Sequence, residues 1–167
     1  MGSGKSAVGR QLARLLRLPF HDSDHEIEQR TGVDIPLIFE KEGETGFRAR
    51  ERDIIAELTA LDAIVLSTGG GAVLLAENRQ HLRERGVVIY LETSVAQQVK
   101  RVRTGRQRPL LANVDPASKL EELMQQREPL YREIADFTFR TDQHRVQGVA
   151  AKIVAQLRAT SRRSPPS

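Results

Sequence analysis

The sequence contains no cysteine and no tryptophan, and only 4% of its residues are aromatic. The absence of cysteine excludes disulfides, thiolate nucleophiles and cysteine-ligated zinc. The scarcity of aromatic residues argues against a stacking platform for single-stranded nucleic acid. No apolar run approaches the roughly 20 residues that span a bilayer, and no signal peptide pattern opens the chain. These absences lead us to expect a cytoplasmic protein with no membrane partner.

The chain is mildly basic, with a formal net charge of +4 and 29% charged residues over its 167 residues. This length is typical of one domain with its own hydrophobic core. Basic and acidic residues are interleaved rather than clustered, which favours a small anionic ligand and no nucleic-acid partner. The four histidines show neither metal-ligand spacing nor a Ser-His-Asp arrangement.

The first six residues, Met1-Gly2-Ser3-Gly4-Lys5-Ser6, match the second half of the phosphate-binding motif G-x-x-x-x-G-K-[ST]. Glycines in such a loop let backbone N–H groups converge on phosphate oxygens, and the following helix adds its positive end. Lys5 supplies a mobile charge for the β- and γ-phosphates, and the Ser6 hydroxyl can bind Mg²⁺. The sequence therefore predicts a nucleotide site at this end of the chain.

Short apolar runs alternate with amphipathic stretches, which indicates an α/β fold with a parallel sheet flanked by helices. The apolar runs are continuous, as is typical of strands buried on both faces. Expected strands cover residues 18–22, 63–67, 86–91 and 137–140, and expected helices cover 8–16, 44–61, 74–85, 94–103, 116–134 and 145–159. Pro129 falls inside one of these helices, where a kink or a break is expected.

Two carboxylates, Asp22 and Asp24, come at the end of the first expected strand. One interpretation is helix capping, because Asp or Ser just before a helix satisfies its first backbone N–H groups. The other is ligand binding, because strand ends in open α/β sheets face the ligand crevice. There, one carboxylate could reach Mg²⁺ and the other a substrate hydroxyl. The two interpretations are compatible.

Arg48 and Glu51 share one face of the expected helix at 44–61, because they lie three residues apart. They form either a solvated ion pair or an arginine that Glu51 holds so that it grips a carboxylate with two hydrogen bonds.

Three consecutive glycines, Gly69, Gly70 and Gly71, follow the expected strand at 63–67. A turn requires only one or two glycines. A close approach of the backbone to a ligand is therefore the better interpretation.

Residues 104–116 break the alternating pattern and lack periodicity. They form either an ordinary surface loop or a mobile lid that brings arginines over phosphates. Residues 160–167, which end in Arg-Arg-Ser-Pro-Pro-Ser, are expected to form a disordered tail.

Taken in order, these motifs resemble the shikimate kinase family. The matching segments are residues 2–6, 22–24, 46–51, 69–71, 108–111 and 127–131. The resemblance implies a P-loop NTPase-type fold whose five parallel strands have the order 2-3-1-4-5. It also implies a single kinase domain over residues 1–159, with a substrate-binding segment at about 22–60 and the lid at about 104–116. The expected oligomeric state is a monomer.

The resemblance also implies the reaction, in which the γ-phosphoryl group of ATP moves to the 3-hydroxyl of shikimate during aromatic amino-acid biosynthesis. Its cofactors would be ATP and Mg²⁺, its partners shikimate and ATP, and its catalytic residues Lys5, Asp24 and Arg108. Residues that would bind ATP are Gly2, Ser3, Gly4, Lys5, Ser6, Ala7, Arg101, Arg108 and His144. Mg²⁺ would bind Ser6 and, through water, Asp22.

Residues that the resemblance assigns to shikimate are Asp24, Arg48, Glu51, Gly69, Gly70, Gly71 and Arg127. In this assignment Arg48 and Arg127 clamp the substrate carboxylate, and Glu51 orients Arg48. Asp24 holds hydroxyl groups and accepts the proton of the attacking one.

One part of the family pattern is missing from the sequence. In the family, an apolar strand and a further glycine precede the matched motif, and that strand lies at the centre of the sheet. A misassigned start is the preferred explanation, and a fragment or a poorly folding chain are the alternatives. The competing functions are an inactive, truncated nucleotide-binding fragment and another small-molecule kinase such as gluconate kinase.

Overall fold

The structure is a computed structural model that describes residues 3–103, 115–142 and 144–161. Its elements are α1 (Lys5–Leu16), β1 (Phe20–Asp22), α2 (Ser23–Thr31), α3 (Ile35–Leu58), β2 (Val65–Ser67), η1 (Ala72–Leu74), α4 (Ala76–Arg85), β3 (Ile89–Glu92), α5 (Val95–Arg103), α6 (Pro116–Ile134), β4 (Phe137–Arg140) and α7 (Val146–Ser161). None of the described helices combines the length and the apolar character needed to cross a membrane.

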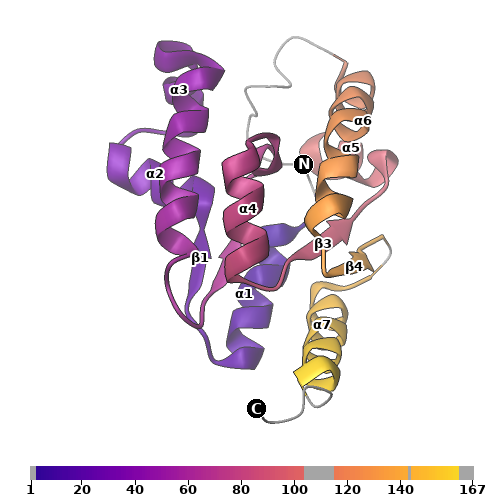
Figure 1. Cartoon of the computed structure of the whole chain (residues 1–167). Coiled ribbons are helices and arrows are strands. Elements are labelled where there is room, and N and C mark those ends of the chain that lie inside the picture. Colours follow the sequence, from indigo (N-terminus) through magenta and orange to yellow (C-terminus); the bar gives the residue numbers. More distant parts are fainter. Residues whose placement is uncertain (1–2, 104–114, 143, 162–167) are drawn as a thin grey trace.

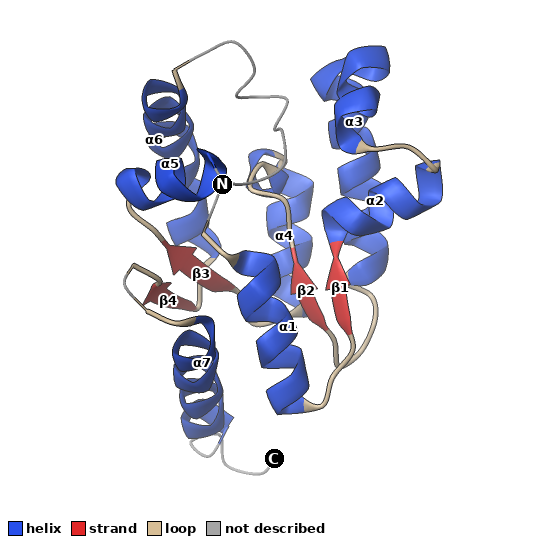
Figure 2. Ribbon diagram, turned by 180° about the vertical axis from the view of Figure 1, so that it is seen from behind, coloured by secondary structure: helices blue, strands red, loops and turns tan. Residues whose placement is uncertain are grey.

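The strands within the described residues form two parallel pairs. β1 pairs with β2 so that His21 lies opposite Leu66, and β3 pairs with β4 so that Tyr90 lies opposite Thr138. α4 lies in front of the strands in Figure 1. In Figure 2, which shows the molecule from the opposite side, α1 lies in front of them, so helices cover both faces of the sheets. The predicted parallel α/β fold is confirmed, and the two pairs correspond to the outer pairs of the expected order 2-3-1-4-5.

β2 and β3 each pair on one side only, and in the described part of the chain no strand joins the two pairs. Two cavities of about 360 and 330 Å³ lie between them and share walls formed by Leu66, Ile89 and Leu91. Lys5 borders both cavities, while Gly69 and Gly70 border the larger one. The phosphate loop and the glycine segment therefore meet at one end of this space.

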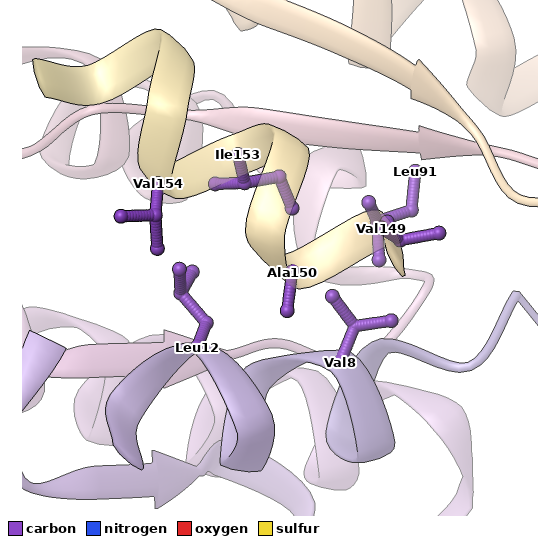
Figure 3. Close-up of a cluster of buried hydrophobic side chains, with 7 residues drawn as sticks. All are labelled: Val8, Leu12, Leu91, Val149, Ala150, Ile153 and Val154. Carbon is purple, nitrogen blue, oxygen red and sulfur yellow. The ribbon is translucent and has the colours of Figure 1, made fainter. Parts of the chain in front are cut away.

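The amphipathic α1 packs against α7 in a hydrophobic cluster to which β3 also contributes (Figure 3). Its members are Val8, Leu12, Leu91, Val149, Ala150, Ile153 and Val154. Val8 and Leu12 lie one helical turn apart and point at the same face of α7. This contact holds α1 in place, and the phosphate loop lies at the N-terminal end of that helix.

α3 begins earlier than the sequence predicts and contains a kink. Asp34 caps it, since Asp34 Oδ1 accepts a hydrogen bond from the Leu37 N–H at 3.0 Å. The kink lies at Gly43, where φ is 69° and ψ is −176°, a left-handed conformation that favours glycine. The expected helix start at 44 therefore marks the second part of α3, which carries Arg48 and Glu51.

Two further expectations differ from the structure. α6 runs through Pro129 without the expected break, because the buried Leu123, Arg127 and Ile134 hold the helix on both sides of the proline. α7 continues to Ser161, two residues into the expected tail, since its buried face packs on α1. The rest of that tail, residues 162–167, and most of the proposed lid, residues 104–114, lie outside the described residues.

We predict that Ile153→Ala lowers the free energy of unfolding by about 2–5 kcal/mol, because the lost side chain leaves a cavity between α1 and α7. Ile153 is only 1% exposed. Lys152→Ala, on the exposed side of the same turn, is the control and should change this free energy by less than about 0.5 kcal/mol. Urea unfolding measures both, and equal losses would contradict the packing of α7 on α1.

Candidate functional site

The chain enters α1 through Gly4, whose φ of 82° and ψ of 21° lie in the left-handed region. No side chain caps this helix, and its first turn contains no acidic residue. The first backbone N–H groups of an α-helix have no partner within the helix, so this end of α1 suits an anion. Lys5 Nζ donates to Ser3 Oγ at 3.4 Å, which places the predicted lysine at the same loop. Gly2 lies outside the described residues.

Ser6 and Asp22 meet although they lie far apart in the sequence. Ser6 Oγ donates to Asp22 Oδ2 at 2.6 Å, and Asp22 Oδ1 accepts a hydrogen bond from the Asp24 N–H at 3.2 Å, which caps α2. Capping and site formation therefore coexist at Asp22. A hydroxyl and a carboxylate are oxygen donors of the kind that Mg²⁺ prefers, so Ser6 and, through water, Asp22 could hold the ion.

Gly69 lies directly against two carboxylates. A Cβ atom on this residue would be 2.7 Å from Glu51 Oε1 and 2.8 Å from Asp24 Oδ1, so any side chain here would force these carboxylates to shift. The Gly69 N–H donates to the hydroxyl of Ser23, which is 0% exposed, at 3.1 Å. The close approach at the glycine segment is to side chains of the protein itself, and the expected approach to a ligand stays a prediction.

The Arg48 guanidinium is held by two glutamates. Its Nη1 donates to Glu51 Oε2 at 2.5 Å, while Nε and Nη2 donate to Glu44 Oε1 at 3.2 and 3.0 Å. A Cβ on Gly71 would overlap the guanidinium, so this second glycine also leaves necessary room. Burial disfavours the positive charge, but Glu51 and Glu44 outweigh that effect and raise the pKa of Arg48 above its ordinary value. The Arg48–Glu51 contact is a buried ion pair rather than a solvated one.

Arg127 projects from α6 toward the same place and is 3% exposed. Its side chain interacts with the hydroxyl of Tyr131, which in turn donates to the Gly70 carbonyl oxygen. The Tyr131 ring stacks on Tyr90 with centroids 5.1 Å apart. Burial lowers the pKa of Arg127, and the nearby positive charge of Arg48 lowers it further. An anion bound beside Arg127 would offset both effects, because a negative charge stabilises the guanidinium.

The structure thus brings together seven of the residues that sequence reasoning assigned to the acceptor side and to the metal. They are Asp22, Asp24, Arg48, Glu51, Gly69, Gly71 and Arg127, with Gly70 tied to them through Tyr131. The expected nucleotide residues Gly4, Lys5 and Ser6 adjoin this group, because Ser6 contacts Asp22.

The remaining assigned residues make no described contact with this group or lie outside the described residues. His144 is exposed in the loop after β4, where its Nδ1 lies 2.7 Å from the Asp142 carbonyl oxygen. Ala7 is exposed in the first turn of α1. Arg101 belongs to α5, but its side chain and the whole of Arg108 lie outside the described residues. Their roles stay predictions.

Sequence reasoning missed Ser23, Glu44 and Tyr131 as members of the site. Glu44 precedes Arg48 by four residues and Tyr131 follows Arg127 by four, a spacing that places helical side chains on one face. This four-residue spacing could have identified both Glu44 and Tyr131 from the sequence. Ser23 could only be recognised once β1 and β2 are paired, because its partner Gly69 is 46 residues away.

Comparisons with known proteins find similarity to shikimate kinases along nearly the whole chain. The family model described as shikimate kinase matches residues 1–158. The shikimate kinase of Pseudomonas syringae pv. tomato is 57% identical over 157 residues, which cover 94% of this chain and 91% of that protein. The solved shikimate kinase from Acinetobacter baumannii in complex with shikimate is 50% identical with a TM-score of 0.93, covering 98% of this chain and 91% of that chain. The solved shikimate kinase from Aquifex aeolicus is 30% identical with a TM-score of 0.81, covering 98% and 95%.

We predict that Gly69→Ala lowers the free energy of unfolding by about 1–3 kcal/mol, because its methyl group would press on two buried carboxylate oxygens. Gly148→Ala is the matched control, since nothing lies within 4 Å of its added Cβ. Gly148 lies in the first turn of α7, where the change should raise the free energy of unfolding by no more than about 0.5–1 kcal/mol, the value for a helix interior. Urea unfolding measures both free energies. A loss for Gly69→Ala together with a gain for Gly148→Ala supports the close approach at Gly69, and equal changes in the two variants would refute it.

Proposed function

This chain belongs to the shikimate kinase family, and we propose that it transfers the γ-phosphoryl group of ATP to the 3-hydroxyl of shikimate at the site described above. The observation that carries the proposal is the meeting of Arg48 and Arg127 with Asp24 beside the phosphate loop. The first two suit a carboxylate, and the third suits a hydroxyl group. The relative from Acinetobacter baumannii, whose fold matches along 98% of this chain, was solved with shikimate bound.

The phosphate end of the site consists of Lys5, the N-terminus of α1 and the Ser6–Asp22 pair. Lys5 and the helix end hold the phosphates by charge and backbone hydrogen bonds. Ser6 Oγ and Asp22 Oδ2 would hold Mg²⁺, which when bound neutralises charge on the phosphates. Phosphoryl transfer needs positioning and charge neutralisation rather than a covalent nucleophile, and this end supplies both.

Asp24 stands between the two ends, two residues after Asp22 and against Gly69. In the proposed reaction its carboxylate accepts the proton of the substrate 3-hydroxyl. The hydroxyl oxygen then forms a bond to the γ-phosphorus while the bond from that phosphorus to the β–γ bridging oxygen breaks. ADP leaves with the electron pair of the broken bond.

The carboxylate end is a clamp formed by the Arg48 and Arg127 guanidinium groups. Glu51 Oε2 accepts a hydrogen bond from Arg48 Nη1 at 2.5 Å and so holds the guanidinium group in place. Tyr131 contacts Arg127 and donates to the Gly70 carbonyl oxygen, which links Arg127 to the glycine segment. A charge-assisted, two-pronged contact with a carboxylate both binds the ring and orients it. The 3-hydroxyl thereby faces Asp24 rather than the solvent.

The family resemblance supports the remaining assignments. Arg108 closes over the phosphates as part of a lid at about 104–116, while Arg101 and His144 contact adenine. The enzyme works as a monomer in the cytoplasm, with residues 1–159 as one kinase domain and residues 22–60 as its substrate-binding segment.

We predict that Arg127→Ala raises the dissociation constant for shikimate by about 10- to 150-fold, the equivalent of the roughly 1.5–3 kcal/mol of a charge-assisted hydrogen bond. The dissociation constant for ATP should change far less, because Arg127 lies at the carboxylate end. Calorimetric titration with each ligand measures both. Equal losses for the two ligands would contradict the clamp.

We predict that Lys5→Met lowers kcat by about 10²–10³-fold, because the reaction loses the charge that stabilises the transferring group. The exposed Lys119, which pairs with Glu122 on the surface of α6, provides the control Lys119→Met. Coupled assays with shikimate, gluconate and nucleoside monophosphates give kcat and identify the acceptor. A turnover within tenfold of wild type would show that Lys5 has another role, and faster turnover of gluconate would favour a gluconate kinase.

A further inference from the structure

We propose that Glu44 is a competing carboxylate built into the clamp: it occupies the side of Arg48 that a substrate carboxylate must take, and binding displaces it. The inference rests on the proposed function, in which Arg48 and Arg127 bind the carboxylate of shikimate. It assigns to Glu44 a role in setting how strongly anions bind.

The hydrogen bonds that Arg48 already forms restrict where an incoming carboxylate can bind to its guanidinium group. Nε and Nη2 face Glu44, and Nη1 faces Glu51. The guanidinium also lies against Gly71, where even a Cβ atom would overlap it. Glu44 thus occupies the Nε–Nη2 edge of the guanidinium, and a ligand carboxylate that forms two parallel hydrogen bonds with this edge has to replace Glu44.

The two glutamates differ in how easily they can leave. The side chain of Glu51 is 0% exposed, whereas that of Glu44 is 47% exposed. Moving Glu51 would leave a buried charge without its partner, while Glu44 can turn into water, where its carboxylate is solvated. The kink at Gly43 directly precedes Glu44, and nothing lies within 4 Å of a Cβ built on that glycine. Glu44 can thus move without disturbing the core.

Glu44 also acts on the second arginine of the clamp. Burial and Arg48 lower the pKa of Arg127, and the negative charge of Glu44 opposes them. Without a ligand, Glu44 therefore neutralises part of the positive charge that both arginines create. A small anion that binds here gains the contacts of Arg48 but removes those of Glu44, so its net gain is small. Shikimate also has ring hydroxyls, and their contacts with Asp24 contribute binding free energy beyond the replacement of Glu44 by the ligand carboxylate.

The test compares Glu44→Gln with Glu42→Gln. Each variant removes one negative charge from the same stretch of α3, but Glu42 pairs with Arg50 at 2.7 and 2.9 Å rather than with Arg48. Calorimetry gives dissociation constants for shikimate, for cyclohex-1-ene-carboxylate, which lacks the hydroxyls, and for the carboxamide of shikimate, which lacks the charge.

We expect Glu44→Gln to lower the dissociation constants of both carboxylates by the same factor, about two- to fivefold, with a larger effect at low ionic strength. The carboxamide should bind Glu44→Gln and wild type alike. Glu42→Gln should leave all three constants unchanged.

Unchanged carboxylate binding in Glu44→Gln, with Arg127→Ala still weakening shikimate, overturns the role of Glu44 and leaves the proposed function standing. Equal tightening of the carboxamide also overturns it, because the effect would then be steric rather than electrostatic. If Arg127→Ala leaves shikimate binding unchanged, the clamp itself is wrong and both proposals fall. Melting temperatures of the variants confirm that each one is folded.

Discussion

The buried ion pair between Arg48 and Glu51 is the constraint on which the acceptor half of the molecule depends. Glu51 is completely buried, and a buried carboxylate without a partner costs several kcal/mol. Arg48 therefore has to remain within ion-pair distance of Glu51. Once Arg48 is fixed, the segment that crosses over both groups has no room for side chains, which accounts for Gly69 and Gly71. Tyr131 then ties that segment to α6 through Gly70. One charge pair thus determines a helix face, a glycine segment and the approach of a second helix.

The phosphate half depends on a different kind of contact. α1 uses Val8 and Leu12 to pack on α7, while its opposite end at Gly4 stays without a side-chain cap. Apolar packing therefore holds the helix in place, and its polar end serves the ligand. The two halves meet through the contact of Ser6 with Asp22 and around the space between β2 and β3. Both strands have open edges toward that space in the described part of the chain, and the helices on either face keep the two sheets side by side.

The sequence predicts the site better where chemistry and spacing are local. The phosphate loop, the Asp22–Asp24 pair and the Arg48–Glu51 spacing each follow from neighbouring residues, and the structure brings them together. The role of Ser23 was hidden because it depends on the pairing of β1 with β2. The spacing of Glu44 and Arg48 was visible in the sequence, but which guanidinium nitrogens Glu44 contacts depends on where the side chain of Arg48 points. Pro129 shows the limit of a local rule: the rule predicts a kink or a break, and α6 continues through the proline without a break, with buried residues on both sides of it.

The same pair of arginines explains why the clamp needs a mobile carboxylate as well as a fixed one. Glu51 forms an ion pair with Arg48 and also interacts electrostatically with Arg127, but burial still lowers the pKa of Arg127. Glu44 supplies the additional negative charge from a half-exposed position on the same helix. In the proposed mechanism a ligand carboxylate exchanges with Glu44 rather than entering an empty positive site. The affinity of the clamp would then be a difference between two carboxylates, and contacts of the ring hydroxyls with Asp24 would decide which ligand gains enough to bind.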